Sequence, residues 1–233
     1  MDIALIPARG GSKRIPRKNI KLFGGIPMIG WPIETAREAG CFDRIIVSTD
    51  DVEIADVARD LGAEVPFMRP AELADDHATA RQVIIHAITA LEEQMGCRID
   101  RVCTLYATAA FARAEDLHAA RHALGQEGSE VDFIFAAAEY PHPVHRAMTQ
   151  DSQGGVQMLF PEHRGTRTQD LPECFHDLGM FYWGHRDAFI SGAAMFSPRS
   201  RPFMIPRTRA VDIDTPQDWA LAEALFAALK DMQ

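Results

Sequence analysis

The feature that most constrains the fold is an alternation of short apolar runs with longer amphipathic stretches over the first 137 residues. The first run, Ile3 to Ile6, lacks polar alternation and stops at a proline, which predicts a strand buried on both faces. We expect strands at 3–6, 44–49, 64–67, 101–105 and 131–137, and helices at 27–40, 52–61, 79–95 and 113–124. Strands and helices that alternate in this way build right-handed βαβ units. The sequence therefore predicts an α/β, Rossmann-like fold of three layers with a mostly parallel sheet.

The alternation breaks after residue 139, where the chain becomes rich in proline and glycine and loses its helical spacing. Within this stretch, the alternating piece 156–160 predicts strands of a projecting β-hairpin. An insertion of this length usually has a function. Beyond it we expect strands at 175–183 and 211–214 and a closing helix at 216–229. We therefore predict one domain over residues 1–233, with residues 139–176 as an inserted arm.

Charge, hydropathy and cysteine content indicate which kinds of partner and which cellular location to expect. The formal net charge of -9 argues against nucleic acid. The sequence has no uninterrupted apolar stretch of about 18 residues and no secretory leader pattern, so we expect no membrane partner. The four cysteines have neither C-x-x-C nor zinc spacing, which indicates reduced thiols and a cytoplasmic location.

A basic loop follows the first predicted strand. Within ten consecutive residues, this loop carries five positively charged side chains: Arg9, Lys13, Arg14, Arg17 and Lys18. Glycines and a serine separate them, so that backbone N–H groups can approach a bound anion. The loop has neither the spacing of a Walker A loop nor the G-x-G-x-x-G dinucleotide fingerprint. Against a negative background, the pattern favours a polyphosphate, with a solvated basic loop as the alternative.

A second candidate site is the pair Asp212 and Asp214. In a strand the two carboxylates would point to the same side, and their mutual repulsion would favour a cation between them. Carboxylate oxygens suit Mg²⁺, which also binds phosphate oxygens. The alternative is that Asp214 caps the closing helix. The pattern alone leaves both interpretations open. Another acidic residue, Asp76, is interpreted as the cap of the helix at 79–95.

The segment from Ala8 to Asn19, A-R-G-G-S-K-R-I-P-R-K-N, resembles the opening signature of the CMP-sugar synthetases, which activate sialic acids with CTP. The resemblance implies a nucleotidyltransferase fold in which Lys13 acts on the leaving pyrophosphate and Asp212 and Asp214 hold a catalytic Mg²⁺. It also implies that Arg69 lies by the nucleotide. The nucleotide-binding residues implied by the resemblance are Ala8, Arg9, Gly10, Gly11, Ser12, Lys18, Asn19, Arg69, Thr79 and Ala80.

Other segments, including 105–111 and 167–172, resemble a branch of that family, the pseudaminic acid cytidylyltransferases. The resemblance implies a sugar pocket lined by Tyr106, Thr108, Arg167, Gln169 and His176. This chain departs from the branch at Ala107 and Ala110, where proline is common. It also departs at Met180, where glutamine is common and a side chain near the substrate is expected.

The resemblance thus implies a cytidylyltransferase that transfers CMP from CTP to a nine-carbon nonulosonic acid, preferably pseudaminic acid, and releases pyrophosphate in an Mg-dependent reaction. N-acetylneuraminic and legionaminic acids are the alternative sugars. The arm implies a homodimer with shared sites. Two other classes remain as alternatives: a non-catalytic nucleotide-binding protein, and a dinucleotide-dependent reductase, which the missing glycine fingerprint disfavours.

Overall fold

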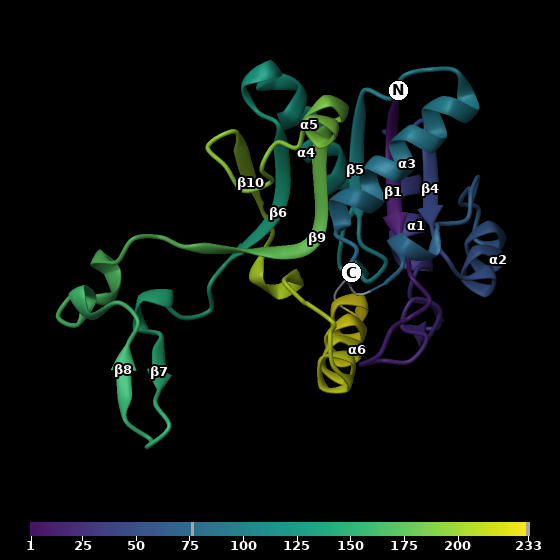
Figure 1. Cartoon of the computed structure of the whole chain (residues 1–233). Coiled ribbons are helices and arrows are strands. Elements are labelled where there is room, and N and C mark those ends of the chain that lie inside the picture. Colours follow the sequence, from purple (N-terminus) through teal and green to yellow (C-terminus); the bar gives the residue numbers. More distant parts are fainter. Residues whose placement is uncertain (76, 232–233) are drawn as a thin grey trace.

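A six-stranded sheet with the strand order β10-β6-β9-β5-β1-β4 organises the chain (Figure 1). The structure, a computed structural model, describes residues 1–75 and 77–231. Asp76, with its predicted capping role, lies outside the described residues. The strands are β1 (Asp2–Pro7), β4 (Arg44–Ser48), β5 (Arg101–Leu105), β6 (Phe133–Glu139), β9 (Phe175–His185) and β10 (Ser200–Met204). Only β9 runs antiparallel to its neighbours in this sheet, which confirms the predicted mostly parallel arrangement.

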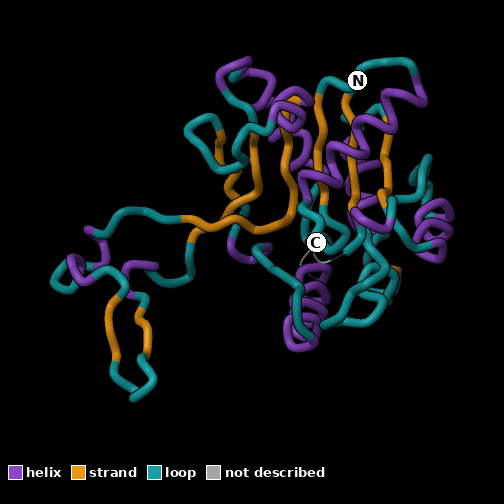
Figure 2. The backbone as a smooth tube through the Cα atoms, viewed as in Figure 1, coloured by secondary structure: helices purple, strands orange, loops and turns teal. Residues whose placement is uncertain are grey.

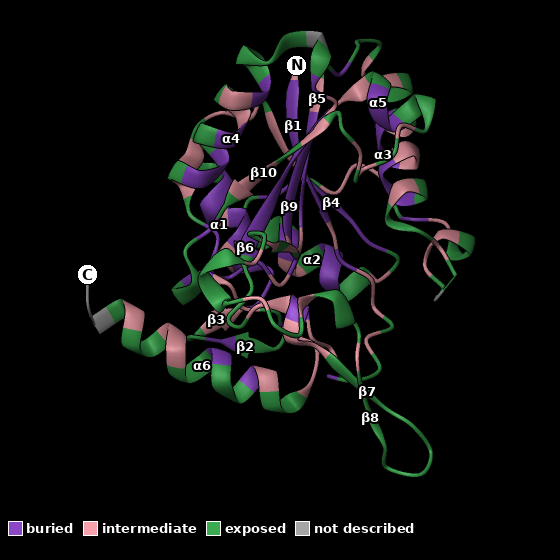
Figure 3. Cartoon of the chain, turned by 90° about the vertical axis from the view of Figure 1, so that its left-hand side faces the viewer, coloured by how far each residue is buried: buried purple, intermediate pink, exposed green. Residues whose placement is uncertain are grey.

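Helices cover both faces of the sheet and give the predicted three layers (Figure 3). One face packs on α1 (Gly30–Ala39) and α4 (Ala114–Gln126), and the other on α3 (Ala80–Met95) and α5 (Arg186–Ser191). Because side chains alternate along a strand, β1 sends Ala4 and Ile6 to the first face and Ile3 and Leu5 to the second. Each core is therefore built from every second residue of the same strands.

Two further helices, α2 (Val52–Asp60) and α6 (Pro216–Asp231), add buried side chains to the core on the α1–α4 face. Asp51 caps the first of them, with its carboxylate accepting a hydrogen bond from the Ile54 N–H at 3.0 Å. Within residues 1–75 and 77–231, every helix is too short or too polar to cross a lipid bilayer.

Two predicted strands are wrong. At 64–67 only Glu64 pairs with the sheet, through a bridge to Ile46, because Pro66 has no N–H to continue the ladder. The segment 211–214 belongs to no strand, and the edge position beside β6 is occupied by β10. The sequence did not indicate β10, whose Pro202 is tolerated because the strand lies at the edge.

Smaller departures concern helix bounds. The helix predicted at 27–40 begins only at Gly30, because a small hairpin of β2 (Leu22–Phe23) and β3 (Ile26–Pro27) precedes it. The helix α5 was not predicted, since its six residues are too few to show a periodic pattern.

The segment between β6 and β9 forms an arm that projects far from the body, as Figures 1 and 2 show. Its tip is a hairpin of β7 (Met148–Gln150) and β8 (Val156–Met158), as the alternating sequence predicted. The Arg146 guanidinium ties the base of this hairpin to the following turn by donating to the carbonyls of His163 at 3.2 Å, Arg164 at 3.4 Å and Thr166. The arm is therefore a folded element with its own polar contacts.

Gly184 on β9 generates the first prediction. A Cβ at this position would lie 2.5 Å from the ring of Phe133 and 2.7 Å from the ring of Phe189, both fully buried. We expect Gly184→Ala to lower the free energy of unfolding by about 1–3 kcal/mol, the usual effect of overpacking. Urea denaturation measures this change. Gly165→Ala, where a Cβ meets open space, is the control, and equal midpoints for the two variants would contradict the prediction.

Candidate active site

A cavity of about 500 Å³ opens at the edge where the parallel strands β1 and β5 end. Ligands bind at this edge in open α/β sheets. Its walls come mainly from the basic loop after β1, the segment after β5, the strand β9 and the stretch before α6, and two further segments contribute Arg69 and Ala80. Its lining residues are Pro7, Arg9, Ser12, Lys13, Arg14, Ile15, Lys18, Asn19, Arg69, Ala80, Tyr106, Ala107, Thr108, Asp177, Gly179, Tyr182, Asp212 and Asp214.

The basic loop is held in shape by contacts with its surroundings. The buried Asn19 amide donates to the Arg9 carbonyl at 3.0 Å, which draws the two ends of the loop together. The Gly10 N–H donates to Asp50 Oδ1 at 3.0 Å. A Cβ at Gly10 would lie only 2.6 Å from Asp51 Oδ2, so this close approach requires glycine. The loop is therefore docked against the turn between β4 and α2.

Arg17 completes this docking and does not line the cavity. It adopts a positive φ of 54°, and its guanidinium pairs with the carboxylates of Asp51 and Glu53. This pairing lowers the pKa of Asp51. The expected set of five cations around an anion is thus corrected to four, because only Arg9, Lys13, Arg14 and Lys18 line the cavity.

The two aspartates before α6 face these cations across the cavity. Asp214 Oδ1 lies 2.9 Å from the Arg14 guanidinium and 3.5 Å from Lys18 Nζ, and Lys18 Nζ also donates to the Ile213 carbonyl at 2.7 Å. Partial burial and the like charge of Asp214 raise the pKa of Asp212. This unfavourable proximity is the electrostatic environment that a bound cation would relieve.

The cap of α6 is a different residue from the one considered in the sequence. Thr215 Oγ1 accepts from the Asp218 N–H at 3.2 Å, and Asp218 Oδ2 accepts from the Thr215 N–H at 2.7 Å. This reciprocal pair is a capping box. The interpretation of Asp214 as the helix cap is therefore wrong, and its carboxylate is left to the cavity.

Arg69, which lies outside the basic loop, is the fifth positively charged residue that lines the cavity. It is only 6% exposed, and it donates to Ser48 Oγ at 3.1 Å and to the Ser48 carbonyl at the end of β4. Burial lowers its pKa. An arginine fixed in this way presents its remaining donors in one orientation, as recognition of an acceptor-rich ligand requires.

Two site residues on β9 were missed by the sequence, Asp177 and Tyr182. The Tyr182 hydroxyl donates to Asp177 Oδ2 at 2.5 Å, and burial together with this bond raises the pKa of Tyr182. A large bulge in β9 brings the two together. Phe135 of β6 pairs with Tyr182, and Ala137, two residues further along β6, pairs with Asp177, so the residues between Asp177 and Tyr182 bulge out of the ladder. No residue pattern signals this bulge, although Asp177 follows directly after the predicted His176.

The structure brings most of the predicted residues together at this cavity. Those that line it are Arg9, Ser12, Lys13, Lys18, Asn19, Arg69, Ala80, Tyr106, Thr108, Asp212 and Asp214. Among the other predicted nucleotide contacts, the side chain of Ala8 is buried in the core, Gly10 and Gly11 belong to the loop, and Thr79 caps α3. Met180, expected near the substrate, is instead a core residue at 3% exposure, and that expectation is wrong.

Three predicted sugar contacts lie elsewhere. Arg167 and Gln169 belong to the arm, and neither lines the cavity of its own chain. His176 packs its ring on Tyr140, with the ring centroids 4.9 Å apart, and also stays outside the cavity. Their contact with a sugar stays a prediction.

Comparison with known proteins gives a consistent result. A family model described as cytidylyltransferase matches residues 3–218. A pseudaminic acid cytidylyltransferase from Campylobacter jejuni is 42% identical over 97% of this chain and 96% of its own length. A CMP-N,N'-diacetyllegionaminic acid synthase from Legionella pneumophila is 32% identical over 96% of this chain and 95% of its own length. Among solved structures, a CMP:2-keto-3-deoxy-manno-octonic acid synthetase complexed with CTP shares the fold, with a TM-score of 0.70, 16% identity, and coverage of 98% of this chain and 99% of that one.

The raised pKa of Asp212 predicts a pH-dependent effect on stability. A carboxyl whose pKa rises on folding favours the folded state while protonated, and this contribution is lost as the pH rises through its folded-state pKa. We therefore expect Asp212→Asn, which cannot ionise, to raise Tm at neutral pH, with a gain that shrinks as the pH falls toward about 4. Calorimetry at several pH values measures it. Asp218→Asn, which weakens the capping box, should lower Tm at neutral pH, and a similar loss in Asp212→Asn would refute the assignment.

Proposed function

This chain belongs to the cytidylyltransferase family, and we propose that it transfers CMP from CTP to pseudaminic acid, a nine-carbon sugar acid that carries acylamino groups, and releases pyrophosphate. The observation that carries this proposal is the single cavity in which four cations of the basic loop face Asp212 and Asp214. The 42% identity to the Campylobacter enzyme over nearly the whole chain supports the choice of sugar.

The cations of the basic loop and the buried Arg69 would bind different parts of the nucleotide. Arg9, Lys13 and Arg14 would neutralise the triphosphate, with Lys13 acting on the leaving pyrophosphate. Arg69 would lie by the nucleoside, and the start of α3 at Ala80 would lie by the cytosine. Arg69 suits that position because Ser48 already fixes its guanidinium.

The reaction would form a bond between the anomeric oxygen of the sugar and the α-phosphorus, while the bond to pyrophosphate breaks in line with it. The hydroxyl proton would pass to solvent water during this displacement. Little covalent work falls to the protein, so catalysis rests on positioning and charge neutralisation. Lys18 is well placed for this role because the Ile213 carbonyl and Asp214 hold its ammonium group between the basic loop and the aspartates.

The donor set fits a magnesium ion, since Mg²⁺ is usually held by one or two carboxylates together with substrate phosphates. Asp212 and Asp214 would be its protein ligands, because both line the cavity beside the cations of the basic loop. When bound, the ion would supply positive charge at the α-phosphate. Arg14 and Lys18, which contact Asp214, would then turn toward the phosphates.

A legionaminic-type acid is the second candidate sugar, favoured by the 32% identity to the Legionella enzyme, with N-acetylneuraminic acid as a further alternative. A non-catalytic nucleotide-binding protein is the candidate of another class. We place the reaction in the cytoplasm, which suits four cysteines that are all free thiols.

We also propose that the arm joins two copies of this chain into a homodimer with shared sites. Met148 and Val156 lie on the same face of the β7–β8 hairpin, because Gln150 pairs with Val156, and both are 63% exposed. The nearby Leu159 is 53% exposed. Apolar side chains gathered on a projecting element fit a partner better than they fit water.

The activity is tested by pyrophosphate release with CTP and Mg²⁺ against pseudaminic, legionaminic and N-acetylneuraminic acids. We expect the highest kcat/KM with pseudaminic acid. Asp212→Asn should lower kcat by at least about 100-fold, the size of effect that loss of an electrostatic catalyst produces. Asp187→Asn, an exposed aspartate outside the cavity, is the control. Turnover of another acid would change the sugar. Binding of CTP without turnover of any acid would favour the non-catalytic protein.

The dimer is tested by light scattering in solution. We expect the unmodified protein to have twice the mass of one chain, and the double variant Met148→Glu with Val156→Glu to have the mass of one chain, because two buried charges would oppose the contact. Leu221→Glu, at a 68% exposed position on α6, is the matched control and should remain a dimer. A double variant that stays dimeric would assign the contact to another surface.

A further inference from the structure

Four consecutive residues at the end of β4, which we call the 48–51 turn, contact two separate parts of the candidate active site. The turn consists of Ser48, Thr49, Asp50 and Asp51. None of the four lines the cavity itself. Ser48 and Thr49 are both 0% exposed, so this part of the turn is fixed inside the protein. The turn can therefore act on a ligand only through the residues that it holds.

The first half of the turn holds Arg69. The Arg69 guanidinium donates to Ser48 Oγ at 3.1 Å and to the Ser48 carbonyl, and the Arg69 N–H donates to the Thr49 carbonyl at 2.7 Å. Burial lowers the pKa of Arg69, and the negative charge of Asp50 opposes this lowering. Side chain and backbone of Arg69 are thus both tied to the turn, which sets how the guanidinium enters the cavity.

The second half of the turn holds the basic loop. The Gly10 N–H donates to Asp50 Oδ1 at 3.0 Å, and Arg17 Nη2 donates to Asp51 Oδ1 at 3.1 Å. Among the residues that the structure describes, Arg17 is the only one other than glycine with a positive φ, of 54°. Such a φ is unfavourable for a residue with a Cβ, so the contacts with the turn must outweigh its cost. The position of the loop therefore depends on Asp50 and Asp51.

We propose that the 48–51 turn positions the two halves of the nucleotide site relative to each other, an inference that rests on the proposed function. Its first half orients Arg69 toward the nucleoside, and its second half keeps the cations of the basic loop in place for the triphosphate. Ser48, Asp50 and Asp51 are then positioning residues, which act on CTP through Arg69 and the basic loop. Because one short segment holds both halves, their spacing is set before CTP binds.

Two probes separate the halves: CTP, which needs both, and inorganic tripolyphosphate, which needs only the basic loop. Calorimetric titration measures Kd for each. We expect Ser48→Ala to raise Kd for CTP by about 10-fold, the value of a hydrogen bond to a charged group, and to leave Kd for tripolyphosphate unchanged. In turnover assays it should raise KM for CTP more than it lowers kcat, because Arg69 binds the nucleoside equally before and during the reaction.

Arg17→Met removes the contact with Asp51 and keeps a Cβ at the positive φ, so it tests the side chain alone. We expect it to raise Kd for both probes by about 10-fold, the cost of ordering a residue that is no longer held. Arg17→Lys, which keeps the positive charge, should recover part of this affinity. Asp50→Ala, at an exposed position, should also weaken both probes, and it decides the question if the Arg17 variants do not fold.

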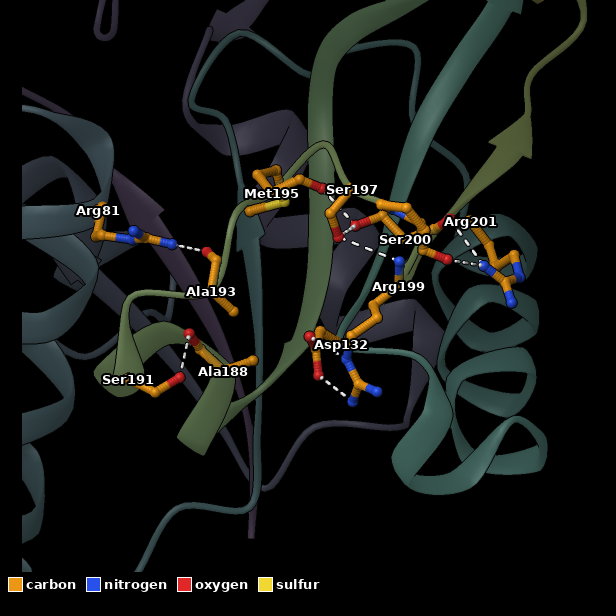
Figure 4. Close-up of polar contacts among 11 residues, drawn as sticks. Arg81, Asp132, Ala188, Ser191, Ala193, Met195, Ser197, Arg199, Ser200 and Arg201 are labelled. Atoms are coloured by element: carbon orange, nitrogen blue, oxygen red, sulfur yellow. Dashed lines mark hydrogen bonds and ion pairs between the residues drawn. The ribbon is translucent and has the colours of Figure 1, made fainter.

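Ser191→Ala and Arg59→Met are the matched controls. The Ser191 hydroxyl donates to the Ala188 carbonyl at 3.3 Å (Figure 4), and the exposed Arg59 pairs with Asp56 at 2.9 Å on α2. Neither residue lines the cavity, so both variants should leave Kd for both probes unchanged. Equal rises for the two probes in Ser48→Ala, or a rise for CTP alone in Arg17→Met, would overturn the inference.

The titrations also separate this inference from the proposed function. If CTP binds but no acid is turned over, the proposed function fails, while the different responses of the two probes would still support the role of the turn. If Ser48→Ala and Arg17→Met bind both probes as tightly as the unmodified protein does, the role of the turn is overturned whatever the turnover assays show.

Discussion

The docking of the basic loop against the turn after β4 is the contact on which the site depends. Four positive side chains in one loop repel one another, and nothing in their local sequence would keep them pointing into a common space. The Arg17–Asp51 pair and the close approach at Gly10 supply that restraint from the side of the loop that faces away from the cavity. Four cations of the loop therefore line the same cavity, while the fifth, Arg17, fixes the loop to its surroundings and does not line the cavity.

The antiparallel strand β9 connects the core, the cavity and the arm. Its last residues pack in the centre of the sheet, its bulge sets Asp177 beside Tyr182, and its first residues run out into the arm. A shift in the arm would therefore act on a strand that also carries two cavity residues. In a dimer that joins through the arm, subunit contact and site geometry would share this mechanical link.

Sequence reasoning located the parts of the molecule in which chemistry and local pattern coincide. The buried strand at 3–6 was recognisable because it is uniformly apolar, and the basic loop because its charges lie close together along the chain. It failed where long-range contacts decide the outcome. The alternation in 211–214 is that of a strand, yet β10 occupies the edge of the sheet beside β6. Asp177 and Tyr182 are five positions apart on a strand that would put them on opposite faces, and only the bulge makes them neighbours.

The capping box of Thr215 and Asp218 has a consequence for how this protein can change over time. Because the closing helix begins on its own pair of side chains, the two aspartates just before it carry no structural duty for that helix. Substitutions at 212 and 214 therefore leave the two side chains that start this helix in place. The ligand set of the cavity can therefore change over time while the start of the closing helix stays the same.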